Sequence, residues 1–246
     1  MHANHSRHHH RSDLVRLAAR AMSERGLQPE FAASVQRQLA AFAGPGSAAD
    51  PAIRDLTGLL WCSIDNDDSR DLDQLTVCEM LDHGAVKMLV AVADVDALVK
   101  KGTPIDDHAR VNTTSVYTSA RIFPMLPERL STDLTSLNPG QDRLALVIEM
   151  VFNADATLAS STVYRAKVHN KAKLAYDAVA AWIQGEGELP AAAAAMPGTD
   201  AQLRTQDSVA QRLRLRRHAE GSLELEIFQP RAVFEGEQVV DIRQQV

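Results

Sequence analysis

The sequence predicts a mixed α/β fold, in which a mixed or antiparallel sheet packs with helices and follows a short helical segment. Several short runs have the composition and the bounding turn residues that are typical of strands. Residues 143–152 and 157–168 flank the turn Asn153-Ala154-Asp155, which predicts a long hairpin. Other stretches repeat apolar residues at the spacing of an amphipathic helix.

The chain divides into three predicted parts. Residues 1–12 contain five of the nine histidines and are expected to be a disordered leader, with a metal-binding tail as the alternative. Residues 13–54 are expected to form a helical segment and a linker, with helices over 13–22 and 31–42. Residues 55–246 form the third and longest part.

Strands and helices alternate within the third part, and no internal repeat is present. The turn Asp82-His83-Gly84 predicts a hairpin between two of the strands. Residues 185–200 are expected to be a mobile connection. Besides the long hairpin, the predicted strands are 58–64, 73–79, 86–95, 222–228 and 238–242, and the predicted helices are 95–101, 174–184 and the basic helix 201–218.

Composition limits the function classes. The chain has 246 residues, a formal net charge of −6, and two cysteines, Cys62 and Cys78. The acidic balance argues against a passive nucleic-acid coat, but it is compatible with an enzyme that holds RNA in a local groove. No apolar run approaches the ~20 residues of a membrane span, and no signal-peptide stretch opens the chain. We expect a cytoplasmic protein with reduced thiols and no membrane partner.

An acidic stretch is the strongest local feature. Five aspartates occupy the nine positions from Asp65 to Asp73, and they repel one another unless a cation or a ring of donors offsets their charge. Hard oxygen ligands suit Mg²⁺, Mn²⁺ or Ca²⁺. An EF-hand does not fit, because Arg70 and Thr76 stand where its loop needs Gly and Glu. A solvated acidic loop is the remaining alternative.

The stretch and its surroundings resemble the start of the RNB catalytic domain of ribonuclease II-like exoribonucleases. In that family an Ile-Asp pair is followed six residues later by an Asp-x-Asp-Asp group; Ile64-Asp65 and Asp71-Leu72-Asp73 match it, with Gln74 in place of the fourth aspartate. The resemblance covers roughly residues 55–246 and extends over only the first half or so of that domain. Further blocks follow in the family's order, namely Val90-Ala91-Val92-Ala93-Asp94-Val95, Ser115-Val116-Tyr117, Phe123-Pro124-Met125-Leu126-Pro127, Leu130-Ser131 and Leu134-Thr135-Ser136-Leu137.

The resemblance implies an enzyme that hydrolyses single-stranded RNA from the 3′ end to nucleoside 5′-monophosphates with Mg²⁺, or with Mn²⁺ in its place. It implies that Asp65, Asp71 and Asp73 hold the metal, with Asp65 as the first choice for a direct ligand. Asp71 and Asp73 are the candidate catalytic residues, and either could ligate metal or position water. The alternative for each is a turn or capping aspartate.

The resemblance also points to an RNA-binding aromatic residue. Tyr117 falls where the family places a side chain that stacks on a base near the 3′ end. Stacking suits a nuclease that tolerates every sequence, whereas a core tyrosine is the alternative. Arg110 and Asn112 stand close to Tyr117 in the sequence and are candidates for phosphate contacts, with a solvated surface as the other interpretation.

Two basic stretches are further candidates for RNA contacts. Arg212 and Arg216 lie one turn apart on the predicted basic helix, so they share a face that could line an RNA channel. A solvated helix face is the alternative. The second stretch comprises Lys167, His169, Lys171 and Lys173.

Two departures from the family pattern leave activity open. The neutral amide of Gln74 ligates Mg²⁺ more weakly than a carboxylate. Relatives continue into a helical half-domain with an arginine that grips the scissile phosphate, and nothing in this sequence matches that half. The alternative function is therefore a truncated, catalytically inactive fragment that at most binds RNA or a partner. A chain that supplies the missing half is a candidate partner.

Overall fold

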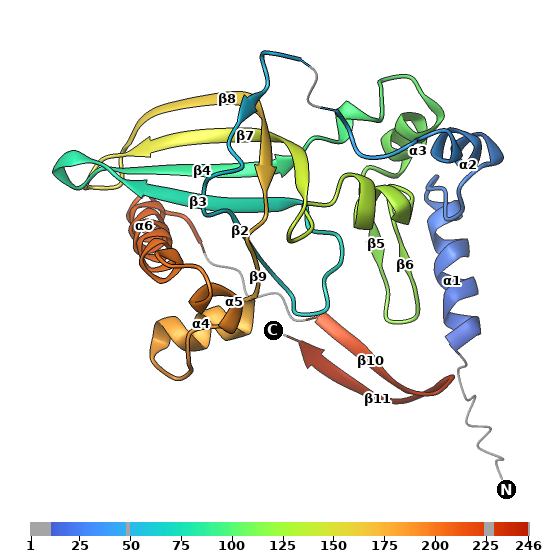
Figure 1. The fold of residues 1–246 in the computed structure, drawn as a ribbon. Helices are drawn as coiled ribbons and strands as arrows, with labels where there is room; N and C mark the ends of the chain where they lie inside the picture. Colours follow the sequence, from blue (N-terminus) through green and yellow to red (C-terminus); the bar gives the residue numbers. More distant parts are fainter. Residues whose placement is uncertain (1–10, 48–49, 224–228, 246) are drawn as a thin grey trace, which may run out of the picture. The chain divides into compact units, whose positions relative to one another are not determined.

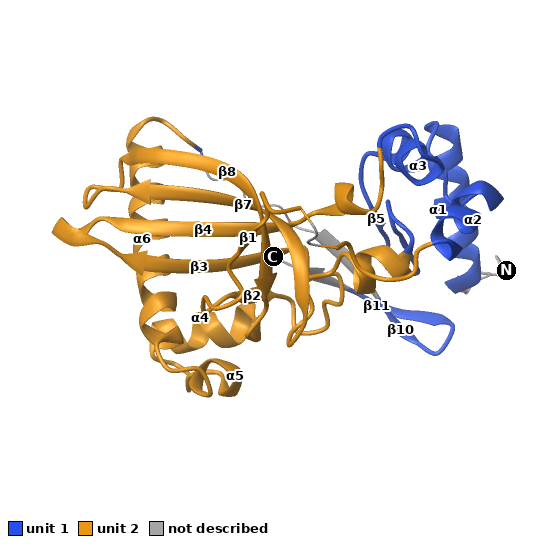
Figure 2. Cartoon of the chain, turned by 45° about the horizontal axis from the view of Figure 1, so that its top comes forward, with its two compact units in different colours: residues 1–41, 101–127, 223–246 blue, residues 42–100, 128–222 orange. Residues whose placement is uncertain are grey.

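The computed structural model describes residues 11–47, 50–223 and 229–245 (Figure 1). The chain separates into two compact units (Figure 2). Unit 1 comprises residues 1–41, 101–127 and 223–246, and unit 2 comprises residues 42–100 and 128–222. This grouping cuts across the division drawn from the sequence, because the N-terminal helices share a unit with two later segments.

Unit 2 is built on a mixed sheet, which confirms the predicted fold class. Its seven strands, among the residues that the structure describes, run in the order β1-β8-β7-β4-β3-β2-β9. The outer pairs β1–β8 and β2–β9 are parallel, and the inner pairs are antiparallel. The strands are β1 (Arg54–Asp55), β2 (Cys62–Asp65), β3 (Gln74–Met80), β4 (Val86–Ala93), β7 (Asp142–Phe152), β8 (Leu158–His169) and β9 (Ala172–Ala175).

Chain connectivity forces this sheet to curl. β8 ends at His169 and β9 begins at Ala172, so two residues join strands that lie five places apart in the sheet. Five spacings in a flat sheet would measure about 24 Å, whereas three Cα steps reach only about 10 Å. The two edges of the sheet must therefore approach each other.

The inner face of the curled sheet holds the main core of unit 2. Leu75, Ala91 and Val147 lie directly opposite one another on β3, β4 and β7, and all three are completely buried. Residues 56–61 connect β1 to β2 and bring Trp61 into the same cluster. The indole Nε1 of Trp61 donates a hydrogen bond of 2.9 Å to the carbonyl of Leu56, so this buried polar group is satisfied.

The described part of unit 2 also holds three α-helices: α4 (Tyr176–Gln184), α5 (Ala191–Ala194) and α6 (Thr199–Ala219). Val209 of α6 packs against Val86 and Phe152 of the sheet. The buried amide of Gln202 also fixes α6, donating to the carbonyl of Leu60 at 2.7 Å. Residues 185–200 are more than a connection, because α5 lies among them and its Ala193 is buried in a second core cluster.

Unit 1 contains three helices and two short hairpins among its described residues: α1 (Arg11–Glu24), α2 (Ala33–Ala40), α3 (Pro104–Asn112), β5 (Val116–Tyr117), β6 (Ile122–Phe123), β10 (Gln229–Glu235) and β11 (Gln238–Gln245). Asn112 ties α3 to the segment after α1, because its side chain accepts from the Gln28 amide at 2.7 Å and donates to the Gln28 carbonyl at 2.9 Å. Gln38 of α2 accepts the otherwise unpaired amide of Ile105 at the start of α3.

Several predicted elements are confirmed with shifted ends, and others were wrong. The helix predicted over 95–101 is only a single 3-10 turn, Val95–Ala97, and α3, which follows it, was missed. The helix predicted from residue 174 begins at Tyr176, because the preceding residues form β9. Residues 1–10 of the histidine-rich leader and residues 224–228 of the predicted strand 222–228 lie outside the described residues. In the part of the chain that the structure describes, no helix is long and apolar enough to cross a bilayer.

Candidate functional site

The acidic stretch forms the loop between the antiparallel neighbours β2 and β3. Asp65 ends β2, and Asp73 immediately precedes β3. β2 and β3 pair at Cys62 and Thr76, which leaves Asp65 and Asp73 at the two ends of the loop. The charge of Asp65 acts on Asp73, so the two carboxylates share one electrostatic environment. Like charges in such an arrangement repel each other.

Asp71 and Asp73 direct their carboxylates away from the protein interior. Leu72 is almost completely buried, whereas Asp71 and Asp73 on either side of it are exposed. Neighbouring side chains on an extended segment point to opposite sides, so one buried leucine turns both aspartates outward. The Ala93 amide at the end of β4 holds the carbonyl of Asp73 at 2.9 Å. In the sequence Asp71-Leu72-Asp73, the buried leucine therefore anchors the segment and the two aspartates on either side of it point outward.

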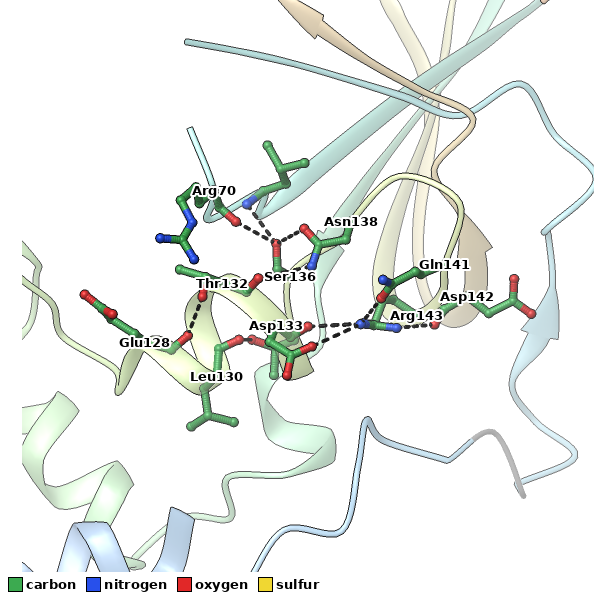
Figure 3. A network of polar contacts seen from close by, with 12 residues as sticks. Arg70, Glu128, Leu130, Thr132, Asp133, Ser136, Asn138, Gln141, Asp142 and Arg143 are labelled. Atoms are coloured by element: carbon green, nitrogen blue, oxygen red, sulfur yellow. Dashed lines mark hydrogen bonds and ion pairs between the residues drawn. The ribbon is translucent and has the colours of Figure 1, made fainter. Parts of the chain in front are cut away.

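The second half of the acidic loop is anchored by Ser136 (Figure 3). The buried hydroxyl accepts a hydrogen bond of 3.0 Å from the amide of Leu72. Its own hydrogen faces two acceptors, the carbonyl of Arg70 at 3.2 Å and the side-chain oxygen of Asn138 at 3.1 Å. The Leu137 amide adds a bond of 2.7 Å to the carbonyl of Leu72. Backbone on both sides of Asp71 is therefore fixed.

Arg143 supports the segment that presents Ser136. This segment begins with a π-helical turn, η3 (Arg129–Leu134), a rare element that often occurs at functional sites. The guanidinium of Arg143 is almost fully buried and donates to the carbonyls of Asp133, at 3.1 Å, and Asp142, at 3.0 Å (Figure 3). Burial lowers the pKa of Arg143, and the carboxylates of Asp133 and Asp142 act in the opposite direction.

The first half of the acidic loop is held by Lys173 of β9. Its ammonium group donates to the carbonyl of Asp67 at 3.0 Å and to that of Ser69 at 2.7 Å. Parallel pairing of β9 with β2, in which Lys173 stands opposite Ser63, brings the lysine to the loop. Lys173 belongs to the second basic stretch of candidate RNA contacts, but the structure directs its charge to the acidic loop.

The three candidate aspartates act on one another electrostatically. Partial burial raises the pKa of Asp73 above its ordinary value, and the charges of Asp65 and Asp71 raise it further. Carboxylate oxygens are suitable ligands for Mg²⁺. Among the described residues, however, no three His, Cys, Asp or Glu side chains are grouped closely enough to hold a metal ion. The donor chemistry fits the predicted metal, whereas the geometry does not gather three of these ligands around one point.

The RNA-contact candidates Tyr117 and Arg110 belong to unit 1. Tyr117 lies on the hairpin β5–β6 with 65% of its surface exposed, so its interpretation as a core tyrosine was wrong. Arg110 is exposed on α3 and forms an ion pair with Asp107 at 3.2 Å. Asn112 is buried and bonded to Gln28, so its expected phosphate contact was wrong.

Arg212 and Arg216 lie on α6. Arg212 donates to the carbonyl of Ala154 in the β7–β8 turn. This turn lies next to Val86, at the start of β4, because Val86 pairs with Phe152. The acidic loop lies next to Val92, near the end of β4, because Val92 pairs with Gln74. Val86 and Val92 are six residues apart, which is about 20 Å along a strand. Arg216 forms an ion pair with Glu220 at 3.6 Å. The structure does not bring Arg212 to the acidic loop, and RNA contact by this helix stays a prediction.

Sequence reasoning missed Ser136 as a site residue. Its block, Leu134-Thr135-Ser136-Leu137, was recognised as a match to the family. The signal that marks its role is the polar Ser136 next to apolar residues, because a buried hydroxyl requires hydrogen-bond partners. The sequence does not show that the partners are 64 to 66 residues away in the acidic loop.

Replacement of Ser136 by alanine tests this anchor. Ser136→Ala leaves the buried amide of Leu72 without its acceptor, which we expect to lower the free energy of unfolding by about 1–3 kcal/mol. Chemical denaturation measures the change. Ser160→Ala, at an exposed position on β8, is the matched control and should change stability by no more than about 0.5 kcal/mol. Equal effects of the two substitutions would contradict the anchoring role.

Sequence comparison identifies relatives over the same region. Ribonuclease R of Escherichia coli is 41% identical over 135 residues, which cover 55% of this chain and 17% of that protein. Exoribonuclease 2 of Enterobacter sp. is 38% identical over 135 residues, which cover 54% of this chain and 21% of that protein. The matched region is therefore about a fifth or less of the length of these relatives.

Structural comparison finds the same fold. Mycoplasma genitalium ribonuclease R in complex with double-stranded RNA superposes with a TM-score of 0.84, covering 96% of this chain and 41% of that chain at 24% identity. Yeast Ssd1, a pseudonuclease, gives a TM-score of 0.58 over 71% of this chain and 20% of that chain at 17% identity. At these identities the likeness shows the fold alone.

The family assignment rests on the match to a domain family. The model of the RNB domain matches residues 53–246, which include all of β1 to β9 and the acidic loop. This confirms the resemblance that was drawn from Asp65, Asp71 and Asp73. The chain belongs to the RNB family.

Proposed function

We propose that this protein is a 3′–5′ exoribonuclease that hydrolyses single-stranded RNA to nucleoside 5′-monophosphates with Mg²⁺, for which Mn²⁺ can substitute. The observation that carries the proposal is the acidic loop: Asp65, Asp71 and Asp73 share one electrostatic environment in a chain of the RNB family. The backbone of the loop is held at Asp73, Ser69 and Leu72 by contacts from β4, β9 and the segment after η3.

Asp65, Asp71 and Asp73 would have different roles in hydrolysis. When bound, Mg²⁺ would supply charge that activates water and stabilises the phosphate. Asp65, at the end of a paired strand, offers the most rigid carboxylate. Asp71 and Asp73 project outward from the anchored Leu72, so they can face the scissile phosphate. Partial burial, followed by repulsion from Asp65 and Asp71, raises the pKa of Asp73, and a bound cation would relieve the repulsion.

Tyr117 supplies the second part of the proposal. An exposed aromatic ring on a hairpin can stack on a base without any rearrangement of the core. Arg110, which is exposed on α3, is the accompanying phosphate contact. The solved Mycoplasma genitalium ribonuclease R structures, which contain single-stranded or double-stranded RNA, support RNA as the ligand class. Free thiols at Cys62 and Cys78 are consistent with action in the cytoplasm.

A second candidate function is an inactive RNB protein that binds RNA or a partner chain carrying the rest of a catalytic domain. Two observations favour it. Gln74 replaces a carboxylate, and the described residues do not group three ligands at one point. The pseudonuclease yeast Ssd1 has a similar fold. This candidate keeps the RNA-binding role of Tyr117 and removes the cleavage role of the aspartates.

Linear and circular RNA of identical sequence distinguish the two functions. We expect a 3′-labelled linear oligomer to release labelled nucleoside 5′-monophosphate from the earliest time, because the enzyme begins at a 3′ end. The circular oligomer should stay intact, and a chelator should stop the reaction. Chromatography of the products measures both. Cleavage of the circle would contradict an exonuclease, and no cleavage of either RNA would favour the inactive protein.

Asp73→Asn tests the electrostatics of the site. The fold is favoured while Asp73 is protonated, and this contribution is lost as pH rises through its raised pKa. Without metal, the variant should therefore be more stable than the unmodified protein at neutral pH, and the difference should vanish in acid. Mg²⁺ should stabilise the unmodified protein by about 2.7 kcal/mol at about 100 times its Kd, and the variant less. Thermal melts measure both effects.

Asp68→Asn is the matched control for this experiment. Asp68 is exposed in the same loop and is not among the charges that act on Asp73. Its replacement should leave the response to Mg²⁺ unchanged. If Asp73→Asn and Asp68→Asn respond alike to Mg²⁺, Asp73 does not belong to the metal site.

Tyr117→Ala and Tyr117→Phe test base stacking. Loss of the ring should weaken binding of single-stranded RNA by about 1–3 kcal/mol, while phenylalanine, which keeps the ring, should cost much less. Because Tyr117 is exposed, neither substitution should change the melting temperature appreciably. Fluorescence anisotropy with labelled RNA measures the affinity. An unchanged affinity in a well-folded Tyr117→Ala protein would remove this residue from the site.

A further inference from the structure

We propose that Lys173 is a positioning residue that organises the first half of the acidic loop for RNA cleavage, an inference that rests on the proposed function. The basis is one pair of contacts: the lysine ammonium reaches two backbone carbonyls of the loop, those of Asp67 and Ser69. No aspartate side chain is needed for this arrangement. The lysine therefore brings positive charge to the loop through its backbone, without an ion pair to a carboxylate in these two contacts.

The strand pairing fixes where the ammonium lies. β9 pairs in parallel with β2, so the backbone of Lys173 is held beside the strand that ends at Asp65. The neighbours Ala172 and Leu174 are buried in the core cluster that includes Cys62, while Lys173 between them is only half-buried. Because side chains alternate between the two faces of a strand, the side chain of Lys173 points away from this core. It is long enough for its ammonium group to reach the loop.

The carbonyls of Asp67 and Ser69, which accept from Lys173, belong to one turn of the backbone. The Ser69 amide donates to the carbonyl of Asn66 at 3.1 Å, which closes a turn over residues 66–69. Within this turn the carbonyls of Asp67 and Ser69 converge on one ammonium group at 3.0 and 2.7 Å. Hydrogen bonds to a charged donor are about twice as strong as neutral ones, so Lys173 selects this turn against extended alternatives.

The contacts also meet the electrostatic requirement of the loop. Five aspartates in nine positions need a cation or a set of donors in order to stay together. Lys173 is a cation that belongs to the chain, so the first half of the loop is organised before any metal binds. Ser136 holds the second half at Arg70 and Leu72. Asp71 lies between the two residues that Ser136 holds, and the Ser69 carbonyl that Lys173 holds comes two residues before it.

A positioning role predicts which kinetic constant changes. Lys173 bonds to the loop that carries the carboxylates, whereas the proposed base-stacking residue, Tyr117, belongs to unit 1. Loss of Lys173 should therefore lower kcat by about 10- to 100-fold, because small displacements of reacting groups have effects of this size. KM for RNA should stay within about two-fold, because the RNA contacts are unchanged.

Three variants of the full chain test the proposal. Lys173→Met keeps the length of the side chain and removes the charge and the donors, and Lys173→Arg keeps both. Lys87→Met is the matched control, because Lys87 is half-buried on β4 and pairs with Glu79 instead of the loop. Hydrogen exchange followed by mass spectrometry reports on the loop amides, including that of Ser69. If Lys173→Met does not fold, Lys173→Gln replaces it.

The proposal is supported if loop exchange becomes about ten-fold or more faster in Lys173→Met, recovers in Lys173→Arg and does not change in Lys87→Met, and if kcat falls as expected. Unchanged loop exchange overturns it. Faster exchange with a kcat equal to that of Lys87→Met overturns the role in cleavage. If the unmodified protein does not cleave RNA, the proposed function is wrong, and the role of Lys173 in cleavage is wrong with it. The exchange comparison still decides whether Lys173 organises the loop.

Discussion

Repulsion among the carboxylates between β2 and β3 is the constraint around which this part of the molecule is arranged. Asp65 and Asp73 stand at the two ends of the loop, and partial burial, followed by the charges of Asp65 and Asp71, raises the pKa of Asp73. The anchors of the loop bond to its backbone: an amide of β4, the hydroxyl of Ser136 and the ammonium of Lys173. Because these three anchors bond to the backbone, they fix the loop without neutralising its carboxylates, whose charge can respond to a cation.

The curled sheet makes this arrangement possible. Only two residues connect β8 to β9, so the sheet brings β9 beside β2 although β8 lies near the opposite edge. Lys173 thereby reaches a loop more than 100 residues earlier in the chain. The crossing segment with Trp61 fills the interior that the curl creates. Packing of apolar residues and placement of the charged loop are thus consequences of the same closure.

The sequence was sufficient where the signal is local. The spacing of Asp65, Asp71 and Asp73, the strands β3 and β4, and the long hairpin of β7 and β8 all follow from residues close to one another. The start of α3 also had local signals, with Pro104 at its first position and Asp106 in its first turn, and it was nevertheless missed. Ser136 and Lys173 are different, because their partners are far away in sequence and only the folded sheet brings them together.

The order of these segments along the chain has a consequence for folding during synthesis. Ala93, Ser136 and Lys173 all follow the acidic loop, so a ribosome releases the five aspartates before any residue that restrains them. Contacts that close about 100 residues of chain form late, because the entropy of the intervening segment must be overcome first. The loop therefore acquires its native shape only after β9 has joined β2. A nascent chain that has not reached β9 carries the acidic sequence without the ordered carboxylates.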